Sequence, residues 1–256
     1  MTFEANAPAV IAAAALGPAL CFALLIARLD RRSPRPWLAL LVAFLWGGTV
    51  AAAGAQMVND LALRSLPPQQ VSNWVAPLVE EAFKGSALAV VLLVRADAWR
   101  SVREGILCAL LAGIGFAATE NLGYYVVAAV QGGSVGLARA VYLRGVIEGL
   151  NHGLFAALFG AGLGYARSRC VSRRTALAVG TSGFILAVAL HALWNASLSP
   201  RISAILCNAG EAGGACAVAP APADLLFVAP ALVALFVGPA ALLLALLARK
   251  SPRSSF

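Results

Sequence analysis

Seven apolar stretches, each long enough to cross a membrane as a helix, constrain the fold of this chain more than any other feature. They are residues 8–27, 37–57, 74–94, 105–130, 145–166, 176–198 and 225–248. About 20 apolar residues of helix span a bilayer core roughly 30 Å thick. The stretches are rich in Ala and Leu and lack the period-two alternation of membrane strands. We therefore expect an all-α fold, a polytopic bundle of about seven transmembrane helices.

Charged residues are scarce, and this sets the class of protein. Of the 256 residues, 61 % are apolar and 12 % are charged, and the mean hydropathy is +0.85. Soluble domains carry about 25 % charged residues, so an ordinary soluble domain, a disordered chain and a disulfide-rich secreted domain are excluded. We expect one integral-membrane domain over residues 1–256. Its motif-bearing core spans 74–198, with additional spans within 8–57 and at 225–248.

Basic residues gather in alternate loops, and this pattern predicts the orientation of the chain. The basic set of loops holds Arg28, Arg31, Arg32, Arg35, Arg95, Arg100, Arg103, Arg167, Arg169, Arg173, Arg174, Arg249, Lys250 and Arg253, and the opposite set holds only Arg64, Arg139, Arg144 and Arg201. Because cytoplasmic loops are enriched in Lys and Arg, we expect the N-terminus outside and the C-terminus in the cytoplasm. Membrane insertion with basic loops in the cytoplasm, where anionic lipids attract them, thus explains the net charge of +8 without a nucleic-acid partner. The Ala- and Arg-rich composition with Lys-poor loops indicates a bacterial inner membrane.

Ten polar residues lie inside the predicted spans, where lipid penalises them. They are Glu80, Glu81, Lys84, Glu120, Asn121, Glu148, Asn151, His152, His191 and Asn195. A charged residue at mid-helix costs about 2.5–3.5 kcal/mol on insertion scales. The span at 74–94 contains three of them. We therefore expect it to be surrounded by other helices or to line a water-filled cavity.

The depth and spacing of these residues point to one site. Counted from the outer end of its span, Glu80 is about 9 Å deep, Glu120 about 15 Å, and His152 and His191 about 10 Å, at 1.5 Å per helical residue. Helical spacing also places Glu80 beside Lys84, and His191 beside Asn195. It places Arg144, Glu148 and His152 in one stripe along a helix. We expect a constellation in the outer half of the membrane, contributed by four helices.

Adjacent carboxylates with two imidazoles are the components of a hydrolytic site. A buried carboxylate beside a like charge can act as general base toward water. Histidines and a carboxylate can hold Zn²⁺ with an open position for that water. Alternatively, the acid and one histidine activate water directly, and the second histidine with its Asn stabilises the oxyanion.

The motifs that carry this chemistry resemble those of one known family. In chain order they are Pro77-x-x-Glu80-Glu81-x-x-Lys84, Phe116-x-x-x-Glu120-Asn121, His152 and His191-x-x-Trp194-Asn195. Over roughly residues 74–195 they resemble the PrsW-type intramembrane proteases, which are regarded as membrane-embedded metalloproteases and whose founding member cleaves a membrane-bound anti-sigma factor. The distantly related CAAX prenyl proteases and abortive-infection proteins typically have Arg one position after that of Lys84, and His at the position of Glu120. These differences favour the PrsW branch.

The resemblance implies a role for each matching residue. Glu80 and Glu81 become the catalytic pair, with Glu81 favoured as the base and Glu80 tied to Lys84. Glu120, His152 and His191 become the metal-ligand or acid–base set, and Asn195 an orienting or oxyanion donor. Lys84, Glu148 and Asn121 have supporting roles, Glu148 either by pairing with Arg144 or by orienting His152. We expect a zinc cofactor, and a metal-independent, glutamate-dependent mechanism stays open.

The expected function is therefore an intramembrane endopeptidase that hydrolyses a peptide bond of a membrane protein, such as an anti-sigma-factor-like regulator. The alternative is a proton- or ion-coupled transporter, because buried Glu and His also form proton relays, although no inverted repeat is evident. A non-catalytic membrane scaffold is a third interpretation. The sequence does not indicate an oligomeric state. In the predicted outer loop at 199–224, Cys207 and Cys216 are either a disulfide or two free thiols.

Overall fold

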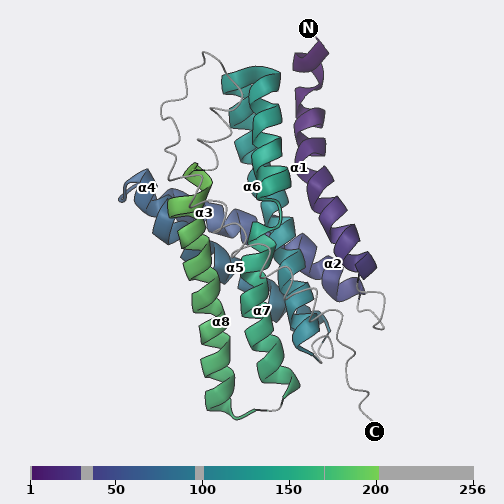
Figure 1. The fold of residues 1–256 in the computed structure, drawn as a ribbon, viewed down its shortest axis with the longest axis vertical. Helices are drawn as coiled ribbons and strands as arrows, with labels where there is room; N and C mark the ends of the chain where they lie inside the picture. Colours follow the sequence, from purple (N-terminus) through teal and green to yellow (C-terminus); the bar gives the residue numbers. More distant parts are fainter. Residues whose placement is uncertain (1, 30–36, 96–100, 170, 202–256) are drawn as a thin grey trace.

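The computed structural model describes residues 2–29, 37–95, 101–169 and 171–201, and every element in these ranges is helical (Figure 1). The all-α prediction is thus confirmed. The elements include four segments of π-helix, named η. In chain order they are α1 (Thr2–Leu29), α2 (Trp37–Trp46), η1 (Gly47–Ala51), α3 (Ala52–Ala62), α4 (Pro68–Gln70), η2 (Val71–Val75), α5 (Ala76–Val94), α6 (Val102–Ala140), η3 (Val141–Ile147), α7 (Asn151–Ser168), α8 (Arg173–Leu193) and η4 (Trp194–Leu198).

Four helical stretches in the described residues are long and apolar enough to cross a membrane. They are Ala7–Arg28, Trp37–Ala62, Val102–Ser168 and Arg173–Arg201. The predicted span at 74–94 corresponds to α5, which is not among the four because it carries three charged residues. The predicted span at 225–248 lies outside the described residues, as do Cys207 and Cys216. The chain is a membrane protein, while seven spans and the orientation stay predictions.

The first half of α6 is the centre of the bundle. It begins after Ser101, whose hydroxyl caps the helix by accepting a hydrogen bond from the backbone N–H of Glu104. Residues 105–118 are buried all round, and α6 packs against α1, α2, α5 and α7. A helix that is apolar on every face belongs inside other helices. The core of the protein therefore surrounds this segment, and α5 is enclosed by α2, α3, α6, α7 and α8.

The predicted single span at 105–130 continues into a hairpin. At Gly133 the backbone takes φ +59° and ψ −146°, a conformation that residues other than glycine rarely adopt. The chain reverses there, and Gly136 packs against the backbone of Ala128. Tyr125 and Leu137 on the two arms share a buried cluster with α1. The hairpin brings η3 back down toward the centre of the bundle.

The predicted continuous helix at 145–166 is wrong. The π-helix η3 ends at Ile147, a turn follows at residues 148–150, and α7 begins only at Asn151. Arg144 and His152 are therefore not on one helical face, contrary to the stripe predicted from their spacing. The turn allows Glu148 and His152 to point in directions that a straight helix would forbid.

Candidate active site

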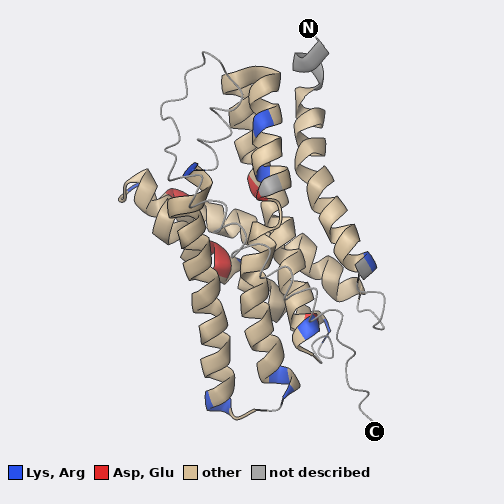
Figure 2. Cartoon of the chain, in the orientation of Figure 1, with Lys and Arg blue, Asp and Glu red and all other residues tan. Residues whose placement is uncertain are grey.

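Charged side chains in the interior of the bundle concentrate where α5, α6, α7 and α8 meet. Figure 2 shows basic residues at the far ends of α7 and α8, and acidic residues near the middle of the molecule. Glu80, Glu81 and Lys84 lie on α5, and each is buried. Their helix begins with Pro77 in its first turn, a position that proline favours.

Lys84 joins the two adjacent glutamates of α5. Its Nζ donates to Glu81 Oε1 at 2.8 Å and lies 3.5 Å from Glu80 Oε2. The ammonium also lies 4.4 Å from the centre of the Phe116 ring, a cation–π contact. Since the Lys84 side chain is 0 % exposed, its charge is compensated by these neighbours. A buried ion pair of this kind is strongly destabilising to break.

His191 on α8 is oriented by Glu81. The distance from His191 Nδ1 to Glu81 Oε1 is 2.9 Å, and the imidazole stacks on the Phe155 ring with centres 5.2 Å apart. A carboxylate only accepts, so the neutral imidazole donates from Nδ1 and keeps a lone pair on Nε2. That Nε2 lies 3.8 Å from Glu80 Oε2.

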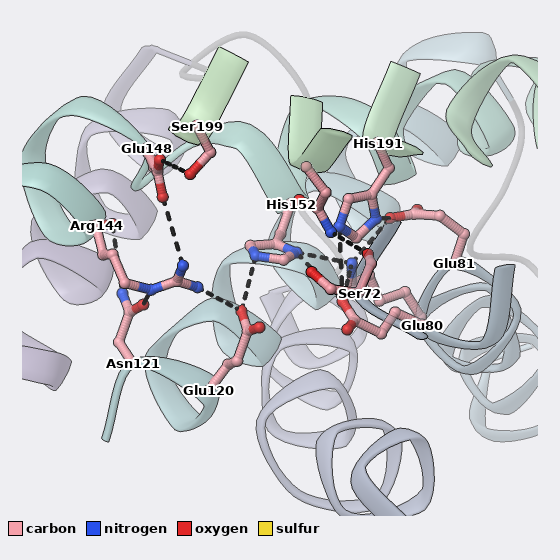
Figure 3. A network of polar contacts seen from close by, with 12 residues as sticks. Ser72, Glu80, Glu81, Glu120, Asn121, Arg144, Glu148, His152, His191 and Ser199 are labelled. Carbon is pink, nitrogen blue, oxygen red and sulfur yellow. Dashed lines mark hydrogen bonds and ion pairs between the residues drawn. The ribbon is translucent and has the colours of Figure 1, made fainter. Parts of the chain in front are cut away.

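His152, in the first turn of α7, is oriented in the same way by Glu120. Its Nε2 lies 2.9 Å from Glu120 Oε2, and its Nδ1 is 2.8 Å from Lys84 Nζ and 3.8 Å from Glu80 Oε2. The neutral ring therefore donates from Nε2, and the lone pair of Nδ1 accepts a hydrogen bond from Lys84 Nζ. Glu80 Oε2 lies farther from that nitrogen than Lys84 does. The two imidazoles meet edge to face, with centres 5.1 Å apart (Figure 3).

Glu80, His152 and His191 could together hold a metal ion. Each offers one ligand atom, and the three atoms lie within 4.8 Å of one another. Glu80 Oε2 is buried and has no hydrogen-bond partner within the described chain. Two histidines and a glutamate form a known catalytic zinc set, and metal-binding histidines typically donate their other nitrogen to a carboxylate, as both do here. The residues present thus fit a metal, which would have to replace the contact of Lys84 with His152 Nδ1.

This cluster differs from the ligand set expected from the sequence. Glu80 takes the place that we assigned to Glu120, and Glu120 lies behind His152 as its carboxylate partner. Glu81 is engaged by both Lys84 and His191, and its side chain is 1 % exposed. The structure therefore separates the two adjacent glutamates: Glu80 faces both imidazoles, whereas Glu81 supports one of them.

Arg144 organises the other side of Glu120 (Figure 3). Its Nη2 lies 2.9 Å from Glu120 Oε2, and its Nε donates to Asn121 Oδ1 at 2.9 Å. The guanidinium also lies 3.6 Å from the centre of the Tyr124 ring and 3.5 Å from Glu148 Oε2. The four-residue spacing had suggested its pairing with Glu148, but the placement of Arg144 in an outer loop hid its contacts with Glu120 and Asn121.

Glu148 pairs with Arg144 rather than with His152. It also accepts a hydrogen bond from Ser199 Oγ at 2.8 Å, which ties the turn after η3 to the residue that follows η4. Asn195 likewise joins two π-helices, because its Nδ2 donates to the carbonyl of Ser72 at 3.0 Å. Single-turn π-helical segments are frequent at functional sites.

A cavity of about 420 Å³ opens beside this cluster. Its volume lies in the range of small-molecule sites. Of the residues assigned from the sequence, Glu120, Glu148, His152, His191 and Asn195 line it, whereas Glu80, Glu81 and Lys84 do not. Residues that sequence reasoning did not assign also line it: Ser72, Tyr124, Val127, Ala128, Gln131, Ala140, Leu143, Arg144, Asn151, Phe155, Trp194, Ser199 and Pro200. The cavity gives water and substrate a route to the two histidines.

The fold and the site together define a helical membrane protein with a buried Glu/His centre suited to hydrolysis. A family model described as PrsW family intramembrane metalloprotease matches residues 35–235. The match covers most of the chain, so the chain belongs to the PrsW family of intramembrane metalloproteases. Comparisons with curated proteins and with solved structures gave no match. Family membership favours proteolysis over the transporter and scaffold interpretations.

Proposed function

We propose that this protein is an intramembrane endopeptidase that hydrolyses a peptide bond in a membrane-protein substrate, with its site in the outer half of a bacterial inner membrane. One observation carries the proposal. Two histidines, each held by its own carboxylate, have their second ring nitrogens 3.8 Å from Glu80 Oε2, beside a cavity that both rings line. Buried ionisable groups in a membrane protein mark functional sites by default. Here they converge on one point beside a cavity, which favours a hydrolytic site over a chain of groups that passes protons along.

Glu80, His152 and His191 would hold the metal, for which zinc is our proposal. When bound, the ion supplies Lewis-acid chemistry, polarising the peptide carbonyl and making water a better nucleophile. Glu81 fixes His191, and Glu120 fixes His152. Lys84 provides positive charge that keeps the carboxylates together in the interior.

We propose Glu120 as the general base, in place of Glu81. Glu120 lines the cavity and its side chain is 20 % exposed, whereas Glu81 does not line it and its side chain is 1 % exposed. Its contacts with Arg144 and His152 both use Oε2, which leaves Oε1 to take a proton from water. The same carboxyl can then return that proton to the amine that leaves, as general acid.

Asn195 is proposed as the donor to the oxyanion. One N–H of its amide is bonded to Ser72, and a carboxamide has a second. A preorganised donor of this kind is worth about 10²–10³ in kcat. A mechanism without metal would use the same residues, with Glu120 and His152 activating water directly.

The test is cleavage of a fluorescein-labelled transmembrane peptide by the purified protein in detergent micelles. We expect Glu120→Gln to lower kcat at least about 100-fold, since general bases contribute 10²–10⁴, and His191→Ala to abolish cleavage. Asp60→Asn is the matched control, because Asp60 pairs with Gln56 on α3 outside the cavity. Its activity should stay within about twofold of the wild type. Cleavage by His191→Ala at the wild-type rate would overturn the proposal.

A further inference from the structure

Asn151 is a buried polar residue beside the site whose hydrogen-bonding groups are unused. It is the first residue of α7, directly before His152, and is 2 % exposed. Neither its Oδ1 nor its Nδ2 has a hydrogen-bond partner within the described chain. The residue lines the cavity together with His152, His191 and Asn195. Among these, Asn151 alone has an amide with both polar atoms unpaired.

Such an arrangement is costly in the free protein. A buried donor or acceptor without a partner costs about 1–3 kcal/mol, and most buried polar side-chain atoms in proteins are paired. Leu has nearly the same shape as Asn and would fill this position without that cost. Both amide atoms are buried from solvent, but the residue borders the reaction cavity, so a rotation of its side chain would bring the amide to a ligand there.

A peptide substrate in this cavity would bring backbone groups that need hydrogen-bond partners. To expose one bond for hydrolysis, a transmembrane helix must unwind, and its freed peptide N–H and C=O groups then lack partners. In the bilayer core every such group must be satisfied by protein or by water in a cavity. A carboxamide offers both a donor and an acceptor, so it can pair with the C=O and the N–H of the substrate backbone.

We propose that Asn151 is a substrate-binding residue, whose carboxamide hydrogen bonds the unwound backbone of the substrate next to the cleaved bond. The inference rests on the proposed function and specifies its substrate class as a transmembrane segment in extended form. Val127, Ala128 and Leu143 form the apolar side of the same cavity and would receive the side chains. Backbone recognition by Asn151 makes the site tolerant of substrate sequence.

The test compares Asn151→Leu with the wild type in cleavage of the labelled transmembrane peptide and in thermal unfolding without substrate. We expect Asn151→Leu to lower kcat/KM at least about tenfold, mainly through KM, while Tm stays equal or rises because a destabilising amide is gone. Asn151→Asp keeps the acceptor and loses the donor, and its kcat/KM should fall between the two. Asn59→Leu is the matched control, because Asn59 Oδ1 is also buried and unpaired but lies away from the cavity. Its kcat/KM should be unchanged.

Two results would overturn the inference. An unchanged kcat/KM in Asn151→Leu would show that the amide does not contact substrate. A fall in Tm that parallels the fall in activity would show that the amide supports the fold instead, through internal water. Failure of the proposed function is distinguishable, because wild type and His191→Ala would then treat the transmembrane peptide alike whatever residue occupies position 151.

Discussion

At the scale of single residues, Arg144 is positioned to hold Glu120 in the orientation that the site requires. Its guanidinium contacts Glu120, Glu148, Asn121 and the face of Tyr124 at once. Arg suits this position better than Lys, because its planar fork donates in several fixed directions and stacks on aromatic rings. Arg144 is thus a positioning residue that acts through Glu120.

Arg144→Lys should therefore lower activity without removing the metal. The substitution keeps the charge but loses the Nε donor to Asn121 and the stacking on Tyr124. We expect kcat to fall about tenfold, equivalent to 1.4 kcal/mol, with KM and zinc content unchanged. Arg139→Lys on the same hairpin is the control, because Arg139 does not line the cavity. Equal kcat in both variants, or loss of zinc from Arg144→Lys, would contradict this role.

At the scale of elements, the close packing of α6 against α7 fixes the position of His152. A Cβ on Gly113 of α6 would collide with the backbone carbonyl of His152. Small residues at such contacts let membrane helices approach closely. The site therefore depends on the absence of a side chain at Gly113 as much as on the side chains present.

Gly113→Ala should lower both stability and activity. Overpacking of a tight core costs about 1–3 kcal/mol, and a shift of α7 would displace His152. Gly123→Ala on the same helix is the control, because a Cβ there meets nothing within 4 Å. It should stabilise the helix by up to about 1 kcal/mol, the propensity gain of Ala over Gly. Thermal unfolding in detergent and cleavage of the labelled transmembrane peptide are the measurements, and an equal response of both variants would refute the packing argument.

At the scale of the whole molecule, the sequence predicted the helical membrane fold and gathered most of the site, but not its internal arrangement. Apolar runs predict helices because bilayer thickness sets their length, and shared depth brought Glu80, Glu120, His152 and His191 together. Spacing along a chain does not give the rotation of one helix about its axis relative to another. It could not show that Glu80 rather than Glu120 faces both imidazoles.

The pattern of apolar residues predicted one backbone reversal and missed a break. Gly133 lies in the predicted loop between the spans at 105–130 and 145–166, within the polar run Gln131-Gly132-Gly133-Ser134, which is typical of a turn. The break at residues 148–150 was missed because it lies within a predicted continuous span. Arg144 and Asn151 lie on either side of that break, so their places in the site were not predicted.

The orientation of the whole molecule in the membrane is also open to test. Figure 1 shows the beginning of α1 at one end of the molecule and the connection from α7 to α8 at the other. With the N-terminus outside, that connection and its neighbouring arginines lie in the cytoplasm, as expected for basic residues. An alkaline phosphatase fused near Ser172 should be inactive, and a green fluorescent protein there should be bright. The reverse result would invert the topology.

The central claim is that Glu80, His152 and His191 hold the catalytic metal and that Glu120 works beside it. The most direct test is the zinc content per chain of Glu80→Gln and Glu120→Gln, purified alongside the wild type. Losing a ligand weakens a metal site far more than losing a neighbouring base. We expect about one ion per chain in the wild type and in Glu120→Gln, and almost none in Glu80→Gln. Zinc retained by Glu80→Gln and lost from Glu120→Gln would contradict the account.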